Sequence, residues 1–570
     1  MNDRSEESAS FNLVDEAWVP VIWGNGTAGE VGLRELFERA PDIREITGDC
    51  PQQTIVLIRL ALAILYRAYF VTGLTESDLD EMWLEIWQQG HFDQDTGEYL
   101  QKYHDAFDLF GEHPFMQVAG LEYQSEREMS PVSELVADVP KPDKFLFSMR
   151  NRESLGKLTF PQAARWLLFA QAYDIAGIKT PVKGNTSIKK GKVYPPKGLC
   201  GTGLLGSMEG VYVQRGNLFE TLMLNWTLHD SARAGNTSLY GNPDDTASWE
   251  DGNETSADMR IREPAGPASV FTWQSRRMKL VADQEQQAVI GLIICYGDIT
   301  SLMDKQAIET MCAWRQSRNQ QKKLGTAHIP WMPTQPNSSK ALWRGLASLL
   351  AIDETGEDMR AGVIRWAEHV AEALYDCTDT ELDTLSIHVQ GMTYGAQNGV
   401  FDNSINDYLD IAAILLRHDS LAVSGSIEVV GQSEKAVWFL KRFAGSLEEA
   451  AGNKRKGDSQ TTWENAIAEQ AYDELDGIFR NRIAGFSEHE SVNEYCDAWR
   501  KEVHRVLLRM GNELGSKTGA RQFSAHSIDG HKTGDQKIDP VASAQRAFRN
   551  KLDETLGKLP SPAPRTEEVR

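Results

Sequence analysis

The chain has few cysteines, no long hydrophobic run and a deficit of positive charge. Its six cysteines include no CxxC pair, which argues against a zinc ribbon and against a secreted disulfide framework. The apolar run 55–66 is too short to span a bilayer and is interrupted by Arg59, and no basic segment followed by an apolar core precedes it. We therefore expect a cytoplasmic protein with no membrane partner.

Familiar catalytic motifs are also missing. The chain contains no GxSxG elbow and no HExxH helix. The stretch 201–206 has the spacing of a dinucleotide-binding motif, but Pro195 and Pro196 stand where the preceding strand should be, and a short strand at 210–214 follows. Nothing in these patterns compels an enzyme, and we expect no cofactor and no metal.

Three adjacent His-Asp pairs leave one enzyme class open. An HD-type metal-dependent phosphohydrolase needs such a pair together with further His and Asp ligands from neighbouring helices. Twelve histidines in an acidic chain also produce adjacent pairs by chance. This class therefore stays an alternative, as does a scaffold subunit without nucleic-acid contacts. The pairs are His104-Asp105, His229-Asp230 and His418-Asp419.

The formal net charge of −23 argues against a protein that wraps DNA by itself, because nonspecific duplex binding needs Lys and Arg to neutralise phosphates. It leaves room for DNA contacts confined to a patch. It also suits a subunit that docks on a basic or RNA-containing assembly.

One basic segment stands out, between Ile175 and Met208, where no Asp or Glu occurs. Glycines separate its lysines, and together they allow backbone and ammonium groups to approach a polyanion closely. A solvated surface loop has the same composition. The six lysines are Lys179, Lys183, Lys189, Lys190, Lys192 and Lys197, and we call Lys189, Lys190 and Lys192 the basic cluster.

Hydrophobic periodicity and turn residues predict an α+β fold. The amino-terminal part should be a mixed α/β domain, residues 1–403, and the part from 404 to 570 an all-α four-helix bundle. The predicted strands are 12–22, 270–281 and 288–296, and the predicted amino-terminal helices are 53–71, 76–89 and 160–173. In the bundle, helices are expected at 434–450, from a capping box at 461–464 to about 485, from 487 to about 515, and from 539 onward, with a long loop at 516–538.

Several motifs, taken in order, resemble the large subunit of the type I-E CRISPR Cascade complex, the CasA family. They are NLVDEAWVPV at 12–21, EHPFMQ at 112–117, FTWQ at 271–274 and the carboxy-terminal helical bundle. The resemblance implies a non-catalytic subunit that holds the guide-RNA handle together with other Cascade subunits. It also implies recognition of the protospacer-adjacent motif in double-stranded DNA, the start of duplex opening, and recruitment of a helicase-nuclease.

The resemblance also assigns residues to these roles. The glycine loop of the family falls at Gly177 with Ile178 and Lys179, and the longer glycine run beyond it is an alternative. The other assignments are Lys323 or Lys322 for a DNA-reading lysine, Gln397 and Asn398 for a polar wedge, and Phe147, Met149, Arg150 and Asn151 for a loop toward the guide RNA. The chain lacks the cysteine cluster of some members and has an insertion at 189–197.

These roles are physically reasonable. A glycine backbone can enter a groove that side chains would block, and a lysine can donate to minor-groove acceptors, which separate A·T from G·C only coarsely. Gln397 and Asn398 could insert at a base-pair step, after which the guide RNA reads the sequence by pairing. Without the resemblance, the same two residues are typical of an ordinary polar turn.

Overall fold

The computed structural model divides the chain into two compact units, each described here by itself. Unit 1 comprises Met1–Lys340, Ile352–Glu381 and Leu385–Tyr408, and unit 2 comprises Ala341–Ala351, Leu382–Thr384 and Leu409–Arg570. The structure describes residues 10–139, 155–196, 198–229, 240–250, 256–335, 341–350, 357–378, 382–416, 421–450, 458–487, 491–517 and 540–559.

Unit 1 begins with a small antiparallel sheet in the order β2-β1-β3, made of β1 (Val19–Trp23), β2 (Ala28–Val31) and β3 (Ile43–Ile46). Gly26 has a φ of +83° and the Asn25 side chain accepts the backbone N–H of Thr27, so these residues form the tight turn between β1 and β2. The predicted strand 12–22 is wrong in its first half. There the backbone N–H of Leu13 donates to the carbonyl of Phe107 (3.0 Å), and the Trp18 indole donates to the carbonyl of Leu13 (2.8 Å), so the segment is held outside the sheet.

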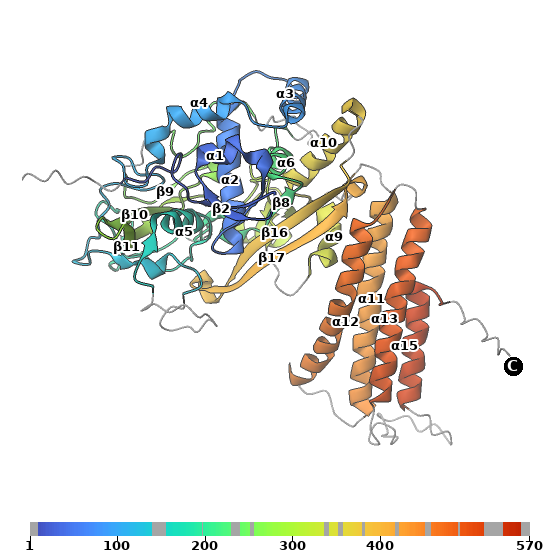
Figure 1. Ribbon diagram of the computed structural model, residues 1–570. Helices are drawn as coiled ribbons and strands as arrows, with labels where there is room; N and C mark the ends of the chain where they lie inside the picture. The colour runs from blue at the N-terminus through green and yellow to red at the C-terminus, as the bar shows by residue number, and fades with distance from the viewer. Residues whose placement is uncertain are drawn as a thin grey trace, which may run out of the picture. The chain divides into compact units, whose positions relative to one another are not determined.

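The predicted amino-terminal helices are confirmed as α2 (Pro51–Ala68), α3 (Glu76–Gln89) and α5 (Phe160–Tyr173). Shorter helices complete this set: α1 (Leu33–Glu38), α4 (Gln94–Lys102) and α6 (Leu218–Asn225). Helix α2 is buried along most of its length, and its Arg59 makes a paired contact with the Glu309 carboxylate (2.8 Å for each oxygen). Figure 1 shows α2 and α5 among the other elements of unit 1.

The predicted hairpin is confirmed as β10 (Arg276–Asp283) and β11 (Ala288–Tyr296), with Arg276 opposite Tyr296. Two short strands, β4 (Ser130–Pro131) and β5 (Leu158–Thr159), also pair with β11. The predicted strand start at residue 270 is wrong, because helix α7 (Pro267–Phe271) occupies that place. Pro267 suits a first helical turn, and buried Asp245 accepts the backbone N–H groups of Ala268 and Ser269.

Another sheet, which lies mostly in unit 1, has the order β17-β16-β8, from β17 (Phe401–Ala412), β16 (Thr384–Tyr394) and β8 (Gly210–Gln214). The turn between β16 and β17 holds the predicted wedge residues. Strand β17 continues past residue 404, so strand structure extends further along the chain than the residue pattern predicted.

Unit 2 contains four long helices that pack against one another, α11 (Leu421–Ala450), α12 (Asp458–Ala484), α13 (Val492–Ser516) and α15 (Pro540–Leu556), so the predicted helical bundle is confirmed. Three predicted helix starts are wrong. Helix α11 begins before the expected start at 434, α12 runs through the expected cap at 461, and α13 begins after the expected start at 487. Ser433 lies inside α11, where its hydroxyl donates to the carbonyl of Val429 (2.7 Å).

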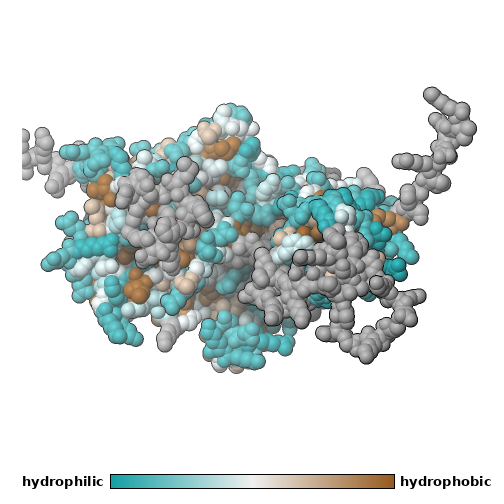
Figure 2. Space-filling view, turned by 90° about the horizontal axis from the view of Figure 1, so that it is seen from below, coloured by the Kyte–Doolittle hydropathy of each residue, from teal (hydrophilic) through white to brown (hydrophobic). Residues whose placement is uncertain are grey.

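None of the helices in the described ranges is long and apolar enough to cross a membrane. The face drawn in Figure 2 is mainly hydrophilic, with small and separate hydrophobic patches.

Candidate nucleic-acid interface

The predicted glycine loop follows directly from α5. Ala176 and Gly177 are half-buried, and the side chain of Ile178 is exposed, at 58%. The backbone of Gly177 does not have a positive φ, and a Cβ atom added there would meet only Ile175, at an ordinary distance of 3.5 Å. The fold of the chain itself therefore does not require glycine at position 177.

A buried arginine holds this loop from inside unit 1. The Arg276 guanidinium donates to the Asp174 carboxylate (2.5 Å) and to the carbonyls of Ile175 (3.1 Å) and Gly201 (2.9 Å). The hydroxyl of Tyr296, across the hairpin from Arg276, donates to the carbonyl of Gly177 (2.9 Å). The first residue of β10 and the last residue of β11 thus hold the loop that follows α5.

The side chain of Lys179 points back into this network. Its ammonium pairs with Asp174 (2.5 Å), and the side chain is only 10% exposed. Its backbone exchanges two hydrogen bonds with Val193 (3.0 and 3.1 Å). We therefore revise the role of Lys179 from a direct DNA contact to a residue that shapes the loop, because its charge already has an internal partner.

The predicted wedge residues lie beside the glycine loop. Gln397 and Asn398 are exposed, with φ values of +57° and +52°, in a short 3-10 turn, η6 (Ala396–Asn398). The backbone N–H of Ala176 donates to the carbonyl of Asn398 (2.8 Å), and the Tyr394 hydroxyl donates to the carbonyl of Tyr173 (2.7 Å). Segments far apart in the sequence thus form one surface, which we call the loop–turn surface: residues 176–178 and 396–398.

The longer glycine run, the alternative position for the glycine loop, is used for packing. The N–H of Gly203 donates to the carbonyl of Asp174 (2.8 Å), and a Cβ atom at Gly203 would overlap the backbone of Ala172 and Tyr173. The run continues into a 3-10 turn, η4 (Leu204–Ser207), and then into β8, as the sequence predicted. Glycine is needed here for close approach within the fold.

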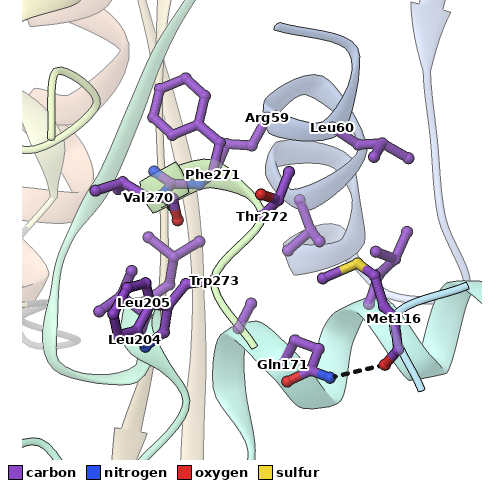
Figure 3. A pocket seen from close by; sticks show the side chains of 13 residues that line it. Arg59, Leu60, Met116, Gln171, Leu204, Leu205, Val270, Phe271, Thr272 and Trp273 are labelled. Atoms are coloured by element: carbon purple, nitrogen blue, oxygen red, sulfur yellow. Dashed lines mark hydrogen bonds between the residues drawn. The ribbon is translucent and has the colours of Figure 1, made fainter. Parts of the chain in front are cut away.

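Behind the loop, a cavity of about 20 Å³ lies between α2, α5, α7 and η4 (Figure 3). Its lining includes Arg59, Leu204 and Trp273, and Gln171 donates from its edge to the carbonyl of Met116 (3.3 Å). A space of this size holds about one water molecule. This cavity is therefore too small for a substrate, and the residues that line it act as a packed support for the loop.

The basic cluster forms the tip of a small hairpin, β6 (Ile188–Lys189) and β7 (Lys192–Val193). Lys190 and Gly191 both have positive φ values, 52° and 68°, as a tight hairpin turn requires. Lys189, Lys190 and Lys192 are exposed, and none has an acidic partner among the described residues. Because Val193 pairs with Lys179, this cluster is attached directly to the glycine loop.

Lys322 and Lys323, the predicted DNA-reading lysines, lie in the last turn of helix α8 (Arg318–Leu324). The Ser317 hydroxyl accepts the N–H of Gln320, and Gly325 ends the helix in the left-handed conformation (φ +69°). Both lysines are exposed. The helix connects two strands of a separate sheet, β13 (Trp314–Gln316) and β14 (Trp331–Pro333), which also contains β15 (Asp358–Met359).

Comparison with known proteins identifies the family. The family model of CRISPR-associated protein Cse1 matches residues 12–510. The chain belongs to the Cse1 family. The crystal structure of Thermobifida fusca Cse1 is 30% identical, with a TM-score of 0.83 over 96% of this chain and 98% of that one. The predicted resemblance to the CasA large subunit of type I-E Cascade is thereby confirmed.

Two further relatives match this Cse1-family chain. A CRISPR-associated protein CasA/Cse1 of Thermus thermophilus is 34% identical over 288 residues, which span 49% of this chain and about half (51%) of the relative. A chain of a solved CRISPR RNA-guided surveillance complex has the same fold, with a TM-score of 0.69 and 16% identity over 95% of this chain and 99% of that one.

Some predicted residues lie outside the described ranges. They are the guide-RNA loop residues Phe147, Met149, Arg150 and Asn151, and also Asp230, His418 and Asp419 of the His-Asp pairs. His104 is described, and its Nε2 atom contacts the carboxylate of Asp15 (2.7 Å). That contact, together with the Asn12 amide donating to the carbonyl of His104 (2.9 Å), ties the amino-terminal segment to the residues after α4.

Sequence reasoning missed Asp174, Arg276 and Tyr296, the residues that position the glycine loop. Arg276 and Asp174 are separated by 102 residues, and no spacing rule connects them. Absence of acidic residues drew attention to the segment starting at Ile175, and Asp174 is the acidic residue immediately before it. The position of Asp174 at the edge of this segment was the one sequence feature that pointed to it.

Proposed function

We propose that this Cse1-family chain is a non-catalytic large subunit of an RNA-guided surveillance complex, and that it recognises the protospacer-adjacent motif in double-stranded DNA and starts duplex opening. One observation carries the proposal: the hydrogen bond from Ala176 to Asn398 (2.8 Å) joins an exposed glycine loop to an exposed polar turn. A groove-reading element and a strand-separating element would thus act on neighbouring positions of one duplex.

The shape of the loop–turn surface supports groove binding. Gly177 presents backbone without a side chain at a position where the fold has room for a Cβ atom, so a groove can approach this backbone closely. Asp174 and Arg276 brace the loop, so its backbone is held in place before DNA arrives. A preorganised backbone loses less conformational freedom on binding.

The turn supports strand separation. Gln397 and Asn398 both adopt left-handed backbone conformations and project at the end of the β16–β17 hairpin. Non-glycine residues in this conformation cost free energy, and such strain concentrates at functional sites. Their amide groups can accept and donate hydrogen bonds to bases released from a pair.

The partners follow from the same proposal. Guide RNA and other Cascade subunits would hold the chain, and a helicase-nuclease would be recruited once the duplex is open, in the cytoplasm. The shared fold with a chain of a solved RNA-guided surveillance complex supports assembly into such a complex. The net charge of −23 supports dependence on partners, because it disfavours DNA binding by the isolated chain.

Replacing Lys323 with alanine tests motif reading. We expect affinity for duplexes with the correct motif to fall by about 1–3 kcal/mol, the usual effect of removing one base-reading side chain, while assembly is unchanged. Filter binding with the assembled complex measures this on matched and motif-mutated targets. Lys322→Ala, made in parallel, decides which lysine reads the motif, and Lys551→Ala in α15 is the control for loss of an exposed charge. A loss of the same size on both targets would show that Lys323 does not read the motif.

Neutralising the basic cluster tests its electrostatic role. The triple variant Lys189→Ala, Lys190→Gly and Lys192→Ala, with glycine at position 190 because of its positive φ, should reduce the salt dependence of target binding, equally for correct and incorrect motifs. The log–log slope should fall by up to about 0.9 for each phosphate that the variant no longer neutralises. Titration of the assembled complex over a salt series measures the slope. Lys183→Ala is the control, because Lys183 is already paired with Glu122. An unchanged slope would show that the cluster is only a solvated hairpin.

A further inference from the structure

Three side chains from distant segments of unit 1 meet in one place away from the loop–turn surface. They are Asp80 of α3, His229 in the segment after α6, and His369 of helix α10 (Gly362–Thr378). Of the His, Cys, Asp and Glu residues that the structure describes, these form a group whose possible ligand atoms all lie within 4.8 Å of one another. Figure 1 shows α3 and α10 near α6, and both helices contact α6.

The donor atoms are those of a transition-metal site. The Nε2 atoms of His229 and His369 face one carboxylate oxygen of Asp80, at 2.8 and 2.9 Å. Imidazole nitrogen with carboxylate oxygen suits Zn²⁺ and related cations. Ligand atoms around a tetrahedral Zn²⁺ lie roughly 3.3 Å apart, so an outward movement of about 0.5 Å would admit the ion.

Nearby carboxylates favour a cation further. Glu76 precedes Asp80 by one helical turn on α3, and Glu372 follows His369 by one turn on α10. The negative charges of both glutamates act on His369. The carboxylates of Asp80, Glu76 and Glu372 therefore give the site a negative potential that favours a cation.

The surroundings hold the histidines in place. The Trp366 ring lies 5.2 Å from the ring of His229 and 5.4 Å from that of His369. The indoles of Trp83 (3.0 Å) and Trp366 (3.4 Å) both donate to the carbonyl of Met223 in α6. His229 is 3% exposed, and its Nδ1 atom has no hydrogen-bond partner among the described residues.

We propose that Asp80, His229 and His369 bind a divalent transition-metal cation of the Zn²⁺ type, which fastens α3 to α10. The sequence predicted no metal here, because the three ligands come from separate segments and only His229 belonged to a His-Asp pair. The competing arrangement is a hydrogen-bonded His-Asp-His group without an ion. Both arrangements give a compact cluster, but only the proposed one contains a metal.

Titration with Co²⁺ distinguishes the two arrangements. We use the full chain, stripped with a chelator, and follow visible absorption and melting temperature as Co²⁺ is added. The expected result is about one tightly bound ion per chain, with a rise in melting temperature. Asp80→Asn, which keeps the side-chain shape, and His369→Ala should each weaken binding by about 100-fold or more and abolish the rise.

His104→Ala is the matched control, because His104 also contacts an Asp carboxylate but lies outside this group. It should bind Co²⁺ as the wild type does. Two outcomes would overturn the proposal: no binding by the wild-type chain, or binding by Asp80→Asn and His369→Ala that equals that of the wild type.

Discussion

A leucine at position 177 is expected to weaken duplex binding by the assembled complex by roughly 30-fold to 1,000-fold, the range of a central interface residue. The chain itself accepts the change, because a Cβ atom at Gly177 meets only Ile175 at 3.5 Å and the backbone has no positive φ. A bulky side chain would instead occupy the space that we assign to the DNA groove. Equilibrium binding to a duplex with the correct motif measures the loss.

The control for this variant is Gly120→Leu. Gly120 is exposed, has no positive φ, and a Cβ atom there has no neighbour within 4 Å. Both variants should melt at the wild-type temperature and assemble normally, and only Gly177→Leu should lose DNA. Equal duplex affinity of the two variants would mean that the glycine loop does not enter DNA.

Removing the side chains of the turn should slow strand opening on fully paired DNA by about 10- to 100-fold, because the variant no longer offsets an unstacking cost of a few kcal/mol. Glycine is the better replacement for Gln397 and Asn398, since both have positive φ and alanine would add backbone strain. A fluorescent base analogue next to the motif reports opening in a stopped-flow experiment.

A target that is already unpaired beside the motif is the control for the turn. On that substrate the double glycine variant should behave nearly as the wild type does, because the base pair is open before binding. If opening or binding falls by the same factor on both substrates, Gln397 and Asn398 are ordinary contacts and the wedge assignment is wrong.

Apolar spacing predicted the buried helices well, and local signals misplaced several helix starts. In α11, Gly425, Gly431 and Ser433 look like breakers, yet the helix continues through all three. A Cβ atom at Gly425 would lie 2.7 Å from the Cys496 sulfur of α13, so this glycine allows the two helices to approach closely. Tertiary packing therefore outweighs local propensity there, and one sequence does not reveal it.

Single residues of the candidate site were predictable from the sequence, but the contacts that bring them together were not. The resemblance assigned Gly177 and Asn398, and composition drew attention to the lysines. Composition could not show that Lys179 turns inward to Asp174 while the three lysines of the basic cluster stay exposed, because all of them occur in the same glycine-rich segment. The contact between Ala176 and Asn398 depends on how α5 and β16 pack, which no local pattern encodes.

The most direct test is site-specific photo-crosslinking from the loop–turn surface in the assembled complex. A photoreactive residue replaces Ile178, which is 58% exposed beside Gly177, or, as the control, Val71, which is 49% exposed beyond the carboxyl end of α2. We predict that the probe at 178 crosslinks to DNA at the motif and the first base pair beside it, and that the probe at 71 does not. Crosslinking at the motif that is no stronger from 178 than from 71 would contradict the account.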